Sequence, residues 1–215
     1  MLIYLLETRE FMDKIRNTLD FYLKAHRLKT ILRQGWQEVG ISCERTESIA
    51  EHIYGSLILA IGLESEYKGK LDMLTVYNML LVKELTKICL DETTTRSTQN
   101  NQNTIEVLRQ ITNGLDNQES LLATLQEFEL GQSSEAQFVK QITKIESDIQ
   151  AKIYDLQGLF DMEKAKADVA YYPDNLVQDI LPQMQNASDG WILYDRQYYK
   201  DPAFQELSSE IQNLK

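Results

Sequence analysis

The feature that most constrains the fold is an apolar side chain that recurs every three or four residues from residue 138 to residue 160. The residues of this stripe are Phe138, Ile142, Ile145, Ile149, Ile153, Leu156 and Phe160. The spacing places them on one face of a single long α-helix. A stripe of this length, without heptads in register elsewhere, predicts the core of a globular helical bundle rather than a coiled coil.

Segments with helical spacing occur along most of the chain, whereas no segment alternates apolar and polar residues as a half-buried β-strand does. The spacing predicts helices over residues 8–25, 28–32, 49–64, 73–88, 105–111, 121–128, 134–160, 174–181 and 202–211. The stretch 190–194 breaks the pattern. Capping residues stand at several predicted starts: Ser48 with Glu51, Asp72, Ser134 with Gln137, and Asp201 before Pro202. We therefore predict one all-α domain.

Charge and composition exclude several classes of partner. The chain has a formal net charge of −11, whereas binding to nucleic acid requires a basic surface. No apolar run approaches the roughly 18 residues of a membrane helix, and residues 1–6 lack the basic start of a signal peptide. Cys43 and Cys89 are too few for a disulfide framework, so we expect free thiols in a reducing cytoplasm.

Residues 33–62 combine a basic and aromatic corner with a capped helix. Arg33 and Trp36 form the corner, and the capping box predicts that the helix begins at Ile49. His52 then falls in the first turns of the helix, and we expect it to form a pocket wall beside the corner. Residues 91–104, which are rich in Thr, Asn and Gln, cannot bury much apolar surface and predict a mobile loop at the pocket's edge.

Four short motifs follow one another in a distinctive order. They are Leu28-Lys29, Arg33-x-Gly35-Trp36, Glu47-Ser48-x-Ala50-Glu51-His52-x-Tyr54 and Phe138-Val139-Lys140-x-x-x-Lys144-x-Glu146. Together they resemble the HD-domain phosphohydrolases, and most of all the 5'-deoxynucleotidase-like branch. The resemblance covers roughly residues 28–151 and leaves residues 161–215 as a C-terminal helical extension. It implies an HD-domain-like helical bundle and, because family members often form dimers, a homodimer.

The resemblance also implies a metal centre. Members of that family hold a divalent metal with a His, an adjacent His-Asp pair and a distant Asp. Such ligands suit Mn, Co, Ni, Zn or Fe, and the ion activates a water that attacks a phosphate. A nearby Glu and Asp manage the water and the leaving group, while an Arg and a Trp hold the nucleotide.

Most of these metal ligands are replaced in this chain. His52 matches the first ligand, but Lys83 and Glu84 stand at the His-Asp pair and Thr143 stands at the distant Asp. The ammonium of Lys83 would lie where a dication belongs, and only a costly deprotonation would let it bind metal. We predict that the metal site is lost, with His52 and Glu84 its only remnants. Lys83 and Glu84 form either a buried ion pair in place of the metal or an ordinary solvated helix face.

The residues around the lost metal are changed as well. Lys87 replaces the Glu that manages the water, and Glu92 matches the Asp of the following loop. Arg33 and Trp36 keep the positions that hold the ligand, although an ion pair for Arg33 and core packing for Trp36 explain them equally well. Glu146 and Asp148 are weaker candidates for substitute metal ligands.

Three functions are compatible with these residues. The first is an inactive phosphohydrolase-like protein, without a metal cofactor, that binds a small phosphate-containing ligand or a partner. Its ligand-binding residues would be Arg33, Trp36, His52, Lys83 and Lys87. The second is an active metal-dependent phosphomonoesterase with altered ligands, and the third is a structural protein that acts through oligomer contacts. Lys83, Lys87 and Thr143 favour the first.

Overall fold

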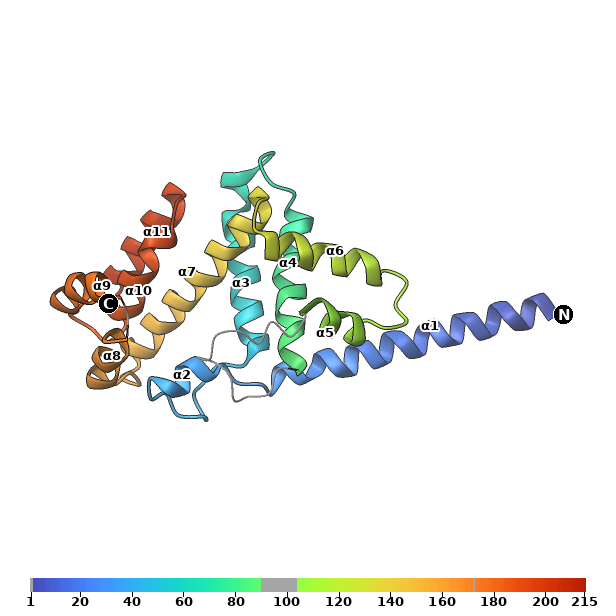
Figure 1. Cartoon of the computed structure of the whole chain (residues 1–215), viewed down its shortest axis with the longest axis horizontal. Helices are drawn as coiled ribbons and strands as arrows, with labels where there is room; N and C mark the ends of the chain where they lie inside the picture. The colour runs from blue at the N-terminus through green and yellow to red at the C-terminus, as the bar shows by residue number, and fades with distance from the viewer. Residues whose placement is uncertain (1, 90–103, 172) are drawn as a thin grey trace.

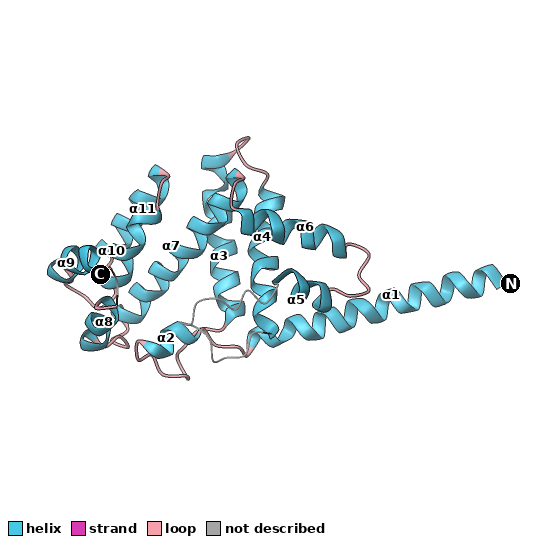
Figure 2. Cartoon of the chain, in the orientation of Figure 1, coloured by secondary structure: helices cyan, strands magenta, loops and turns pink. Residues whose placement is uncertain are grey.

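Eleven α-helices make up the part of the chain that the computed structural model describes, which is residues 2–89, 104–171 and 173–215 (Figures 1 and 2). These residues contain no β-strand, only an isolated bridge between Leu32 and Ser48. The helices are α1 (Leu2–His26), α2 (Gln34–Glu38), α3 (Ile49–Leu63), α4 (Met73–Leu85), α5 (Thr104–Ile111), α6 (Gln118–Leu130), α7 (Ser134–Leu156), α8 (Met162–Val169), α9 (Asp174–Ile180), α10 (Asp189–Asp195) and α11 (Pro202–Asn213). The predicted all-α fold class is confirmed. Residues 91–103 of the predicted loop, Glu92 among them, lie outside the described part, and Thr104 already begins α5.

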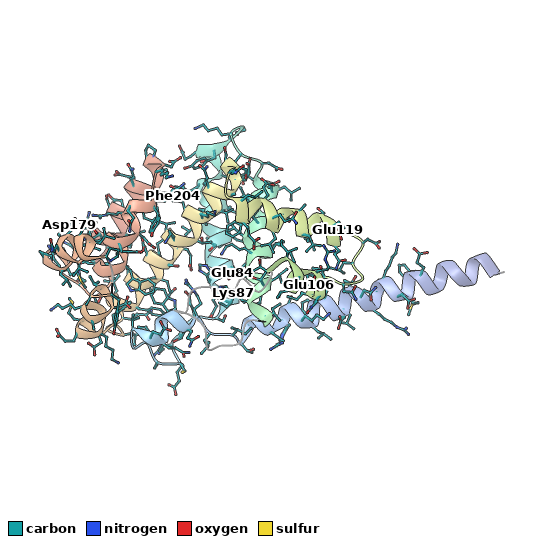
Figure 3. The ribbon with its side chains drawn as sticks, in the orientation of Figure 1. Glu84, Lys87, Glu106, Glu119, Asp179 and Phe204 are labelled. Atoms are coloured by element: carbon teal, nitrogen blue, oxygen red, sulfur yellow. The ribbon has the colours of Figure 1, made fainter. Side chains whose placement is uncertain are left out.

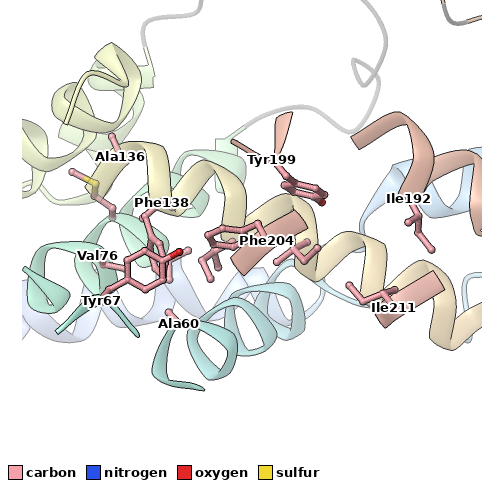
Figure 4. Close-up of a cluster of buried hydrophobic side chains, with 14 residues drawn as sticks. Ala60, Tyr67, Val76, Ala136, Phe138, Ile192, Tyr199, Phe204 and Ile211 are labelled. Atoms are coloured by element: carbon pink, nitrogen blue, oxygen red, sulfur yellow. The ribbon is translucent and has the colours of Figure 1, made fainter. Parts of the chain in front are cut away.

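Helix α7 is the centre of the fold. It crosses α3 and α4 on one side and packs against α10 and α11 on the other (Figure 1). The largest core cluster forms along it and includes Ala60 of α3, Val76 of α4 and Phe204 of α11 around Phe138 (Figure 4). The first turns of the apolar stripe that predicted this helix face the core, because Ile142 and Ile145 are fully buried, whereas Ile153 and Leu156 near its end are exposed.

Several helix starts follow the predicted caps. Ser48 and Glu51 form the capping box of α3, and the carboxylate of Asp72 accepts the backbone N–H of Leu74 at the start of α4. The cap of α7 differs by one position from the prediction. Ser133, not Ser134, accepts the backbone N–H of Ala136.

The sequence misplaced some ends and elements. Helix α7 stops at Leu156 and Gly158 follows with a positive φ of 69°, so Phe160 lies beyond the helix. The predicted helix over residues 28–32 does not form. Only its first two residues lie in a helical turn, the short 3-10 turn Arg27–Lys29. The stretch 190–194, read as an interruption, lies within α10.

Other apolar side chains at helical spacing are exposed as well. Among them are Ile61 of α3 and Leu74 and Leu81 of α4. Each helix contributes a narrower stripe to the core than the count of its apolar residues suggested, because one bundle neighbour covers only part of a helix surface. None of the described helices combines the length and the apolar character that crossing a membrane would take.

The junction between α7 and the C-terminal helices contains a buried carboxyl. Asp148 is fully buried and accepts a hydrogen bond from the Tyr199 hydroxyl at 2.6 Å. Its other oxygen, Oδ1, has no partner among the described residues. Burial and the nearby Asp195 raise the pKa of Asp148 well above its ordinary value.

Replacing this carboxyl by an amide should stabilise the protein at neutral and alkaline pH. The unfolded carboxyl ionises near pH 4 while the folded one keeps its proton, so its contribution to stability falls as pH rises above about 4. We expect Asp148→Asn to raise the free energy of unfolding by about 1–2 kcal/mol at pH 8 and to have little effect at pH 4. Urea unfolding at both pH values measures this. An equal gain at both would contradict it.

Candidate functional site

A cavity of about 900 Å³ opens where α2, α3, α4 and α7 meet the C-terminal helices α8 and α10. Its volume lies in the range of small-molecule sites. The residues that line it include Arg33, His52, Lys83, Thr143, Lys144, Ser147, Trp191 and Asp195. Four of the predicted site residues, Arg33, His52, Lys83 and Thr143, therefore lie around one cavity although they are far apart in the sequence.

Lys83 and Glu84 form a buried ion pair at the end of α4. Both side chains are about nine-tenths buried, and the Lys83 ammonium contacts Oε1 of Glu84 directly. Consecutive residues on a helix point in different directions, so Lys83 must fold back over its neighbour to make this contact. Burial alone would raise the pKa of Glu84, but Lys83 and His52 lower it to about 2. The carboxylate is therefore ionised and holds the ammonium in place.

His52 lies between two carboxyl groups. Its Nδ1 contacts Oε2 of Glu146, and its Nε2 lies 3.8 Å from Oε1 of Glu84. Burial and then the charge of Arg33 lower the pKa of His52 to about 2, while burial and Glu47 raise the pKa of Glu146 to about 8. These shifts favour an uncharged imidazole beside a protonated Glu146 carboxyl. The geometry fits a Glu146 hydroxyl that donates to Nδ1, which places the imidazole proton on Nε2.

Arg33 is anchored at the same place by a second buried acid. Its NH1 donates to Oε1 of Glu47 at 2.5 Å, and its NH2 donates to the Ser147 hydroxyl at 2.9 Å. The indole N–H of Trp36 donates to the same Glu47 oxygen at 2.8 Å. Arg33 NH1 also lies 3.7 Å from Oε2 of Glu146. A guanidinium thus already supplies positive charge between the two carboxyl groups.

The residues that the sequence resemblance matched to the family's metal ligands do not offer groups that fit a dication. The Lys83 ammonium occupies one position, and the Thr143 hydroxyl is a neutral donor that bonds the carbonyl oxygen of Val139 at 3.1 Å. A different trio does offer suitable atoms. Each of three buried residues offers one ligand atom, and these three atoms lie within 4.8 Å of one another. The residues are Glu47, His52 and Glu146, and together they could hold a metal ion. This trio contains His52 of the predicted ligand set and Glu146, one of the two weaker substitute candidates, whereas Asp148 is not part of it.

The structure places the other predicted residues away from the cavity. Trp36 is 1% exposed and stacks on Trp191 with ring centroids 4.4 Å apart, so Trp191 lines the cavity and Trp36 lies behind it. Lys87 is exposed on the 3-10 turn Thr86–Cys89 and is outside the cavity lining, and Figure 3 shows it close to Glu84 near the middle of the molecule.

Sequence reasoning missed four residues that the site uses, and one of them is Glu47, which stood in a quoted motif but received no role. Ser147 falls four positions after Thr143, one helical turn along α7, and this spacing could have identified it. Lys144, which is bonded to Asp195 at 2.8 Å, belonged to a quoted motif but received no role. Trp191 carried no signal, because α10 was read as an interruption.

Comparison with known proteins gives the family. The sequence profile of the HD domain matches residues 25–185, which is most of the chain. The chain belongs to the HD-domain family. Helix α1, except its last two residues, and the whole of α10 and α11 lie outside the matched residues of the HD domain.

Individual proteins and solved structures are also similar to this chain. The 5'-deoxynucleotidase HDDC2 of Bos taurus is 27% identical over 165 residues, which are 70% of this chain and 78% of the relative. A conserved hypothetical protein from Pyrococcus furiosus aligns with a TM-score of 0.65 at 21% identity, covering 91% of this chain and 99% of that protein. A predicted metal-dependent phosphohydrolase from Magnetospirillum magnetotacticum aligns with a TM-score of 0.58 at 18% identity, covering 94% and 96%. These two structures show the fold alone.

Proposed function

We propose that this HD-domain protein binds a small phosphate-containing ligand in its cavity and does not hydrolyse it. The observation that carries the proposal is the buried Lys83–Glu84 ion pair at the position of the family's His-Asp pair. An ammonium at this position cannot lower the pKa of a bound water as a metal ion does, and Glu84 offsets its charge. The site would thus depend on Arg33 to attract an anion and would lose the means to activate the nucleophile.

The cavity offers the groups that recognise a phosphate. Arg33 has five N–H donors and uses one for Glu47 and one for Ser147, so its planar fork keeps donors for a phosphate. Lys83 adds a point charge, and the hydroxyl of Thr143 lines the same cavity. Trp191, also in the lining, gives the rest of the ligand an aromatic surface.

Phosphate binding should depend on Arg33. We expect isothermal titration calorimetry with inorganic phosphate and 5'-deoxynucleoside monophosphates to detect binding at or below millimolar concentration. Arg33→Gln should weaken it at least about 10-fold, because a bidentate charged contact is worth more than 1.4 kcal/mol. Lys166→Gln, an exposed cation on α8 outside the cavity lining, is the matched control and should bind as the wild type does.

The same titration with Lys87→Gln decides whether Lys87 takes part, since it is exposed and outside the cavity lining. Circular dichroism of each variant shows whether the helices remain folded. Binding that is absent at millimolar ligand, or that is unchanged in Arg33→Gln, would contradict the proposal.

The trio Glu47, His52 and Glu146 favours a second candidate, an active phosphohydrolase whose metal centre has moved toward α7. That function requires Glu146 to lose its proton and Arg33 to yield part of its contact with Glu47. Elemental analysis of purified protein separates the two candidates. About one equivalent of Mn, Co, Ni, Zn or Fe that disappears in Glu146→Gln would favour the second, and metal-free protein that binds phosphate would favour the first.

For both candidate functions we propose that the protein lies in the cytoplasm, because the free, exposed thiol of Cys43 suits a reducing compartment.

A further inference from the structure

One long face of α1 is apolar and is not covered by the described part of the chain. Its residues, which we call the outer face of α1, are each between 47% and 61% exposed: Phe11, Met12, Ile15, Leu19, Tyr22 and Leu23. Their spacing follows the helical period, so they occupy about a third of the helix circumference. Helix α1 extends from the body along the long axis of the molecule, with the N-terminus at its tip (Figure 1).

The opposite side of α1 already has its contacts. Asn17 donates from Nδ2 to the carbonyl oxygen of Gly114 at 2.9 Å, and the Lys14 ammonium lies 3.1 Å from Asp116. Phe21 packs against the core cluster formed with α5 and α6. These contacts hold α1 to the body and direct the outer face toward solvent.

The outer face is large enough for a specific interface. Its six side chains expose on the order of 500–800 Å², if each bulky apolar side chain offers roughly 150–250 Å² when fully exposed. Monomeric proteins seldom leave a contiguous apolar patch of this size open to water. Two such faces would together bury about 1,000–1,600 Å², which reaches the range for stable interfaces.

We propose that the outer face of α1 packs against the outer face of α1 in a second copy of this chain, which gives a symmetric homodimer. Met12, Ile15, Leu19 and Tyr22 follow the alternating three- and four-residue spacing of a helix–helix seam. The same patch on both copies makes the contact self-complementary, as two-fold symmetry requires. Because α1 lies almost wholly outside the matched residues 25–185, the contact belongs to a part of the chain that the HD domain does not need.

Charge selects a second copy over a membrane surface. Helix α1 has four acidic and four basic residues, so the net charge of −11 lies in the rest of the chain. A neutral helix approaches its own copy without like-charge repulsion, and it lacks the basic excess that holds amphipathic helices on anionic lipid.

The same distribution of charge favours an antiparallel pair. Parallel helices would bring the two acidic bodies together at one end. Antiparallel helices place the bodies at opposite ends of a pair that is about 37 Å long, given the 25 residues of α1. This length exceeds the Debye length of about 8 Å at physiological salt, so the repulsion between the bodies is screened.

Sedimentation equilibrium of the full chain tests the interface. We expect a dimer at tens of micromolar protein, and Ile15→Glu with Leu19→Glu should weaken it at least about 100-fold, since both copies lose two apolar contacts. Leu130→Glu, on α6 and 70% exposed, is the matched control and should leave the dissociation constant unchanged. Unchanged helical dichroism confirms that the variants fold.

A wild-type monomer at 100 μM, or a dimer that persists in the double variant, would overturn the proposal. Cosedimentation of monomeric protein with phosphatidylcholine vesicles would also overturn it and would assign the outer face to lipid. Orientation is tested with a spin label at His26→Cys in a chain whose Cys43 and Cys89 are changed to Ser. Antiparallel helices place the two labels about 30 Å apart, and parallel ones about 10–15 Å, so the short distance would overturn the antiparallel arrangement.

Discussion

The purified protein is expected to hydrolyse 5'-deoxynucleoside monophosphates more slowly than about 0.01 per second, with or without added Mn²⁺, Co²⁺ or Mg²⁺. Ordinary enzymes turn over at about 1 per second or faster, so the expected loss is at least about 100-fold. The physical reason is the ammonium of Lys83, which is paired with Glu84 at the two positions that the resemblance matches to metal ligands of the family. Thr143 offers a hydroxyl in place of the third. Phosphate release measured over hours, at several metal concentrations, checks the rate.

A reconstructed ligand set provides the positive control. We expect Lys83→His, Glu84→Asp and Thr143→Asp together to bind about one equivalent of divalent metal, because imidazole and carboxylates then face the cavity beside His52. Hydrolysis should stay slow, since the resemblance matches Lys87 to the carboxylate that manages the water in the family. Turnover near 1 per second by the wild-type protein would contradict the proposed function and favour the trio of Glu47, His52 and Glu146 as a working metal centre.

The sequence predicted the fold well because helical periodicity and caps are local signals. The stripe of α7 and the capping box of α3 each lie within one helix, so no knowledge of the tertiary structure was needed. The sequence did not show which apolar helix faces are covered by another helix. Leu74 and Ile61 are apolar at helical spacing and yet exposed, because no other described helix covers them.

In the candidate site, too, a contact within one helix was predicted from the sequence, whereas contacts between helices were not. Lys83 and Glu84 were expected to form either a buried pair or a solvated face, and the structure shows the buried pair. Trp36 could not be placed from the sequence, because its stacking on Trp191 depends on α10 folding back against α2. The contact between Glu146 and His52 likewise depends on where α7 crosses α3, and residue spacing does not determine that crossing.

The second large effect concerns stability. Replacement of Lys83 by Met should lower the free energy of unfolding at pH 7 by about 3–5 kcal/mol, because Glu84 then remains buried without its cation. For a chain of this size the melting temperature should fall by roughly 6–20 °C. Lys87→Met, at an exposed cation one helical turn further on, is the matched control and should change stability by less than about 0.5 kcal/mol.

The double variant Lys83→Met with Glu84→Leu separates the effect of an unpaired buried charge from the effect of changed packing. Because it removes both charges and fills the space with apolar atoms, it should recover most of the stability that the single variant loses.

The effect of Lys83→Met on stability should also depend on pH. The pKa of wild-type Glu84 is about 2, so its carboxylate stabilises the fold at every pH above the ordinary pKa of a Glu side chain. This contribution is lost as the pH falls toward 2. In Lys83→Met the pKa of Glu84 should instead rise, so the deficit should be largest at pH 7 and shrink toward pH 4. Urea unfolding of the four proteins across this range measures both effects, and a double variant no more stable than the single one would show that the pair does not hold α4 in place by its charge.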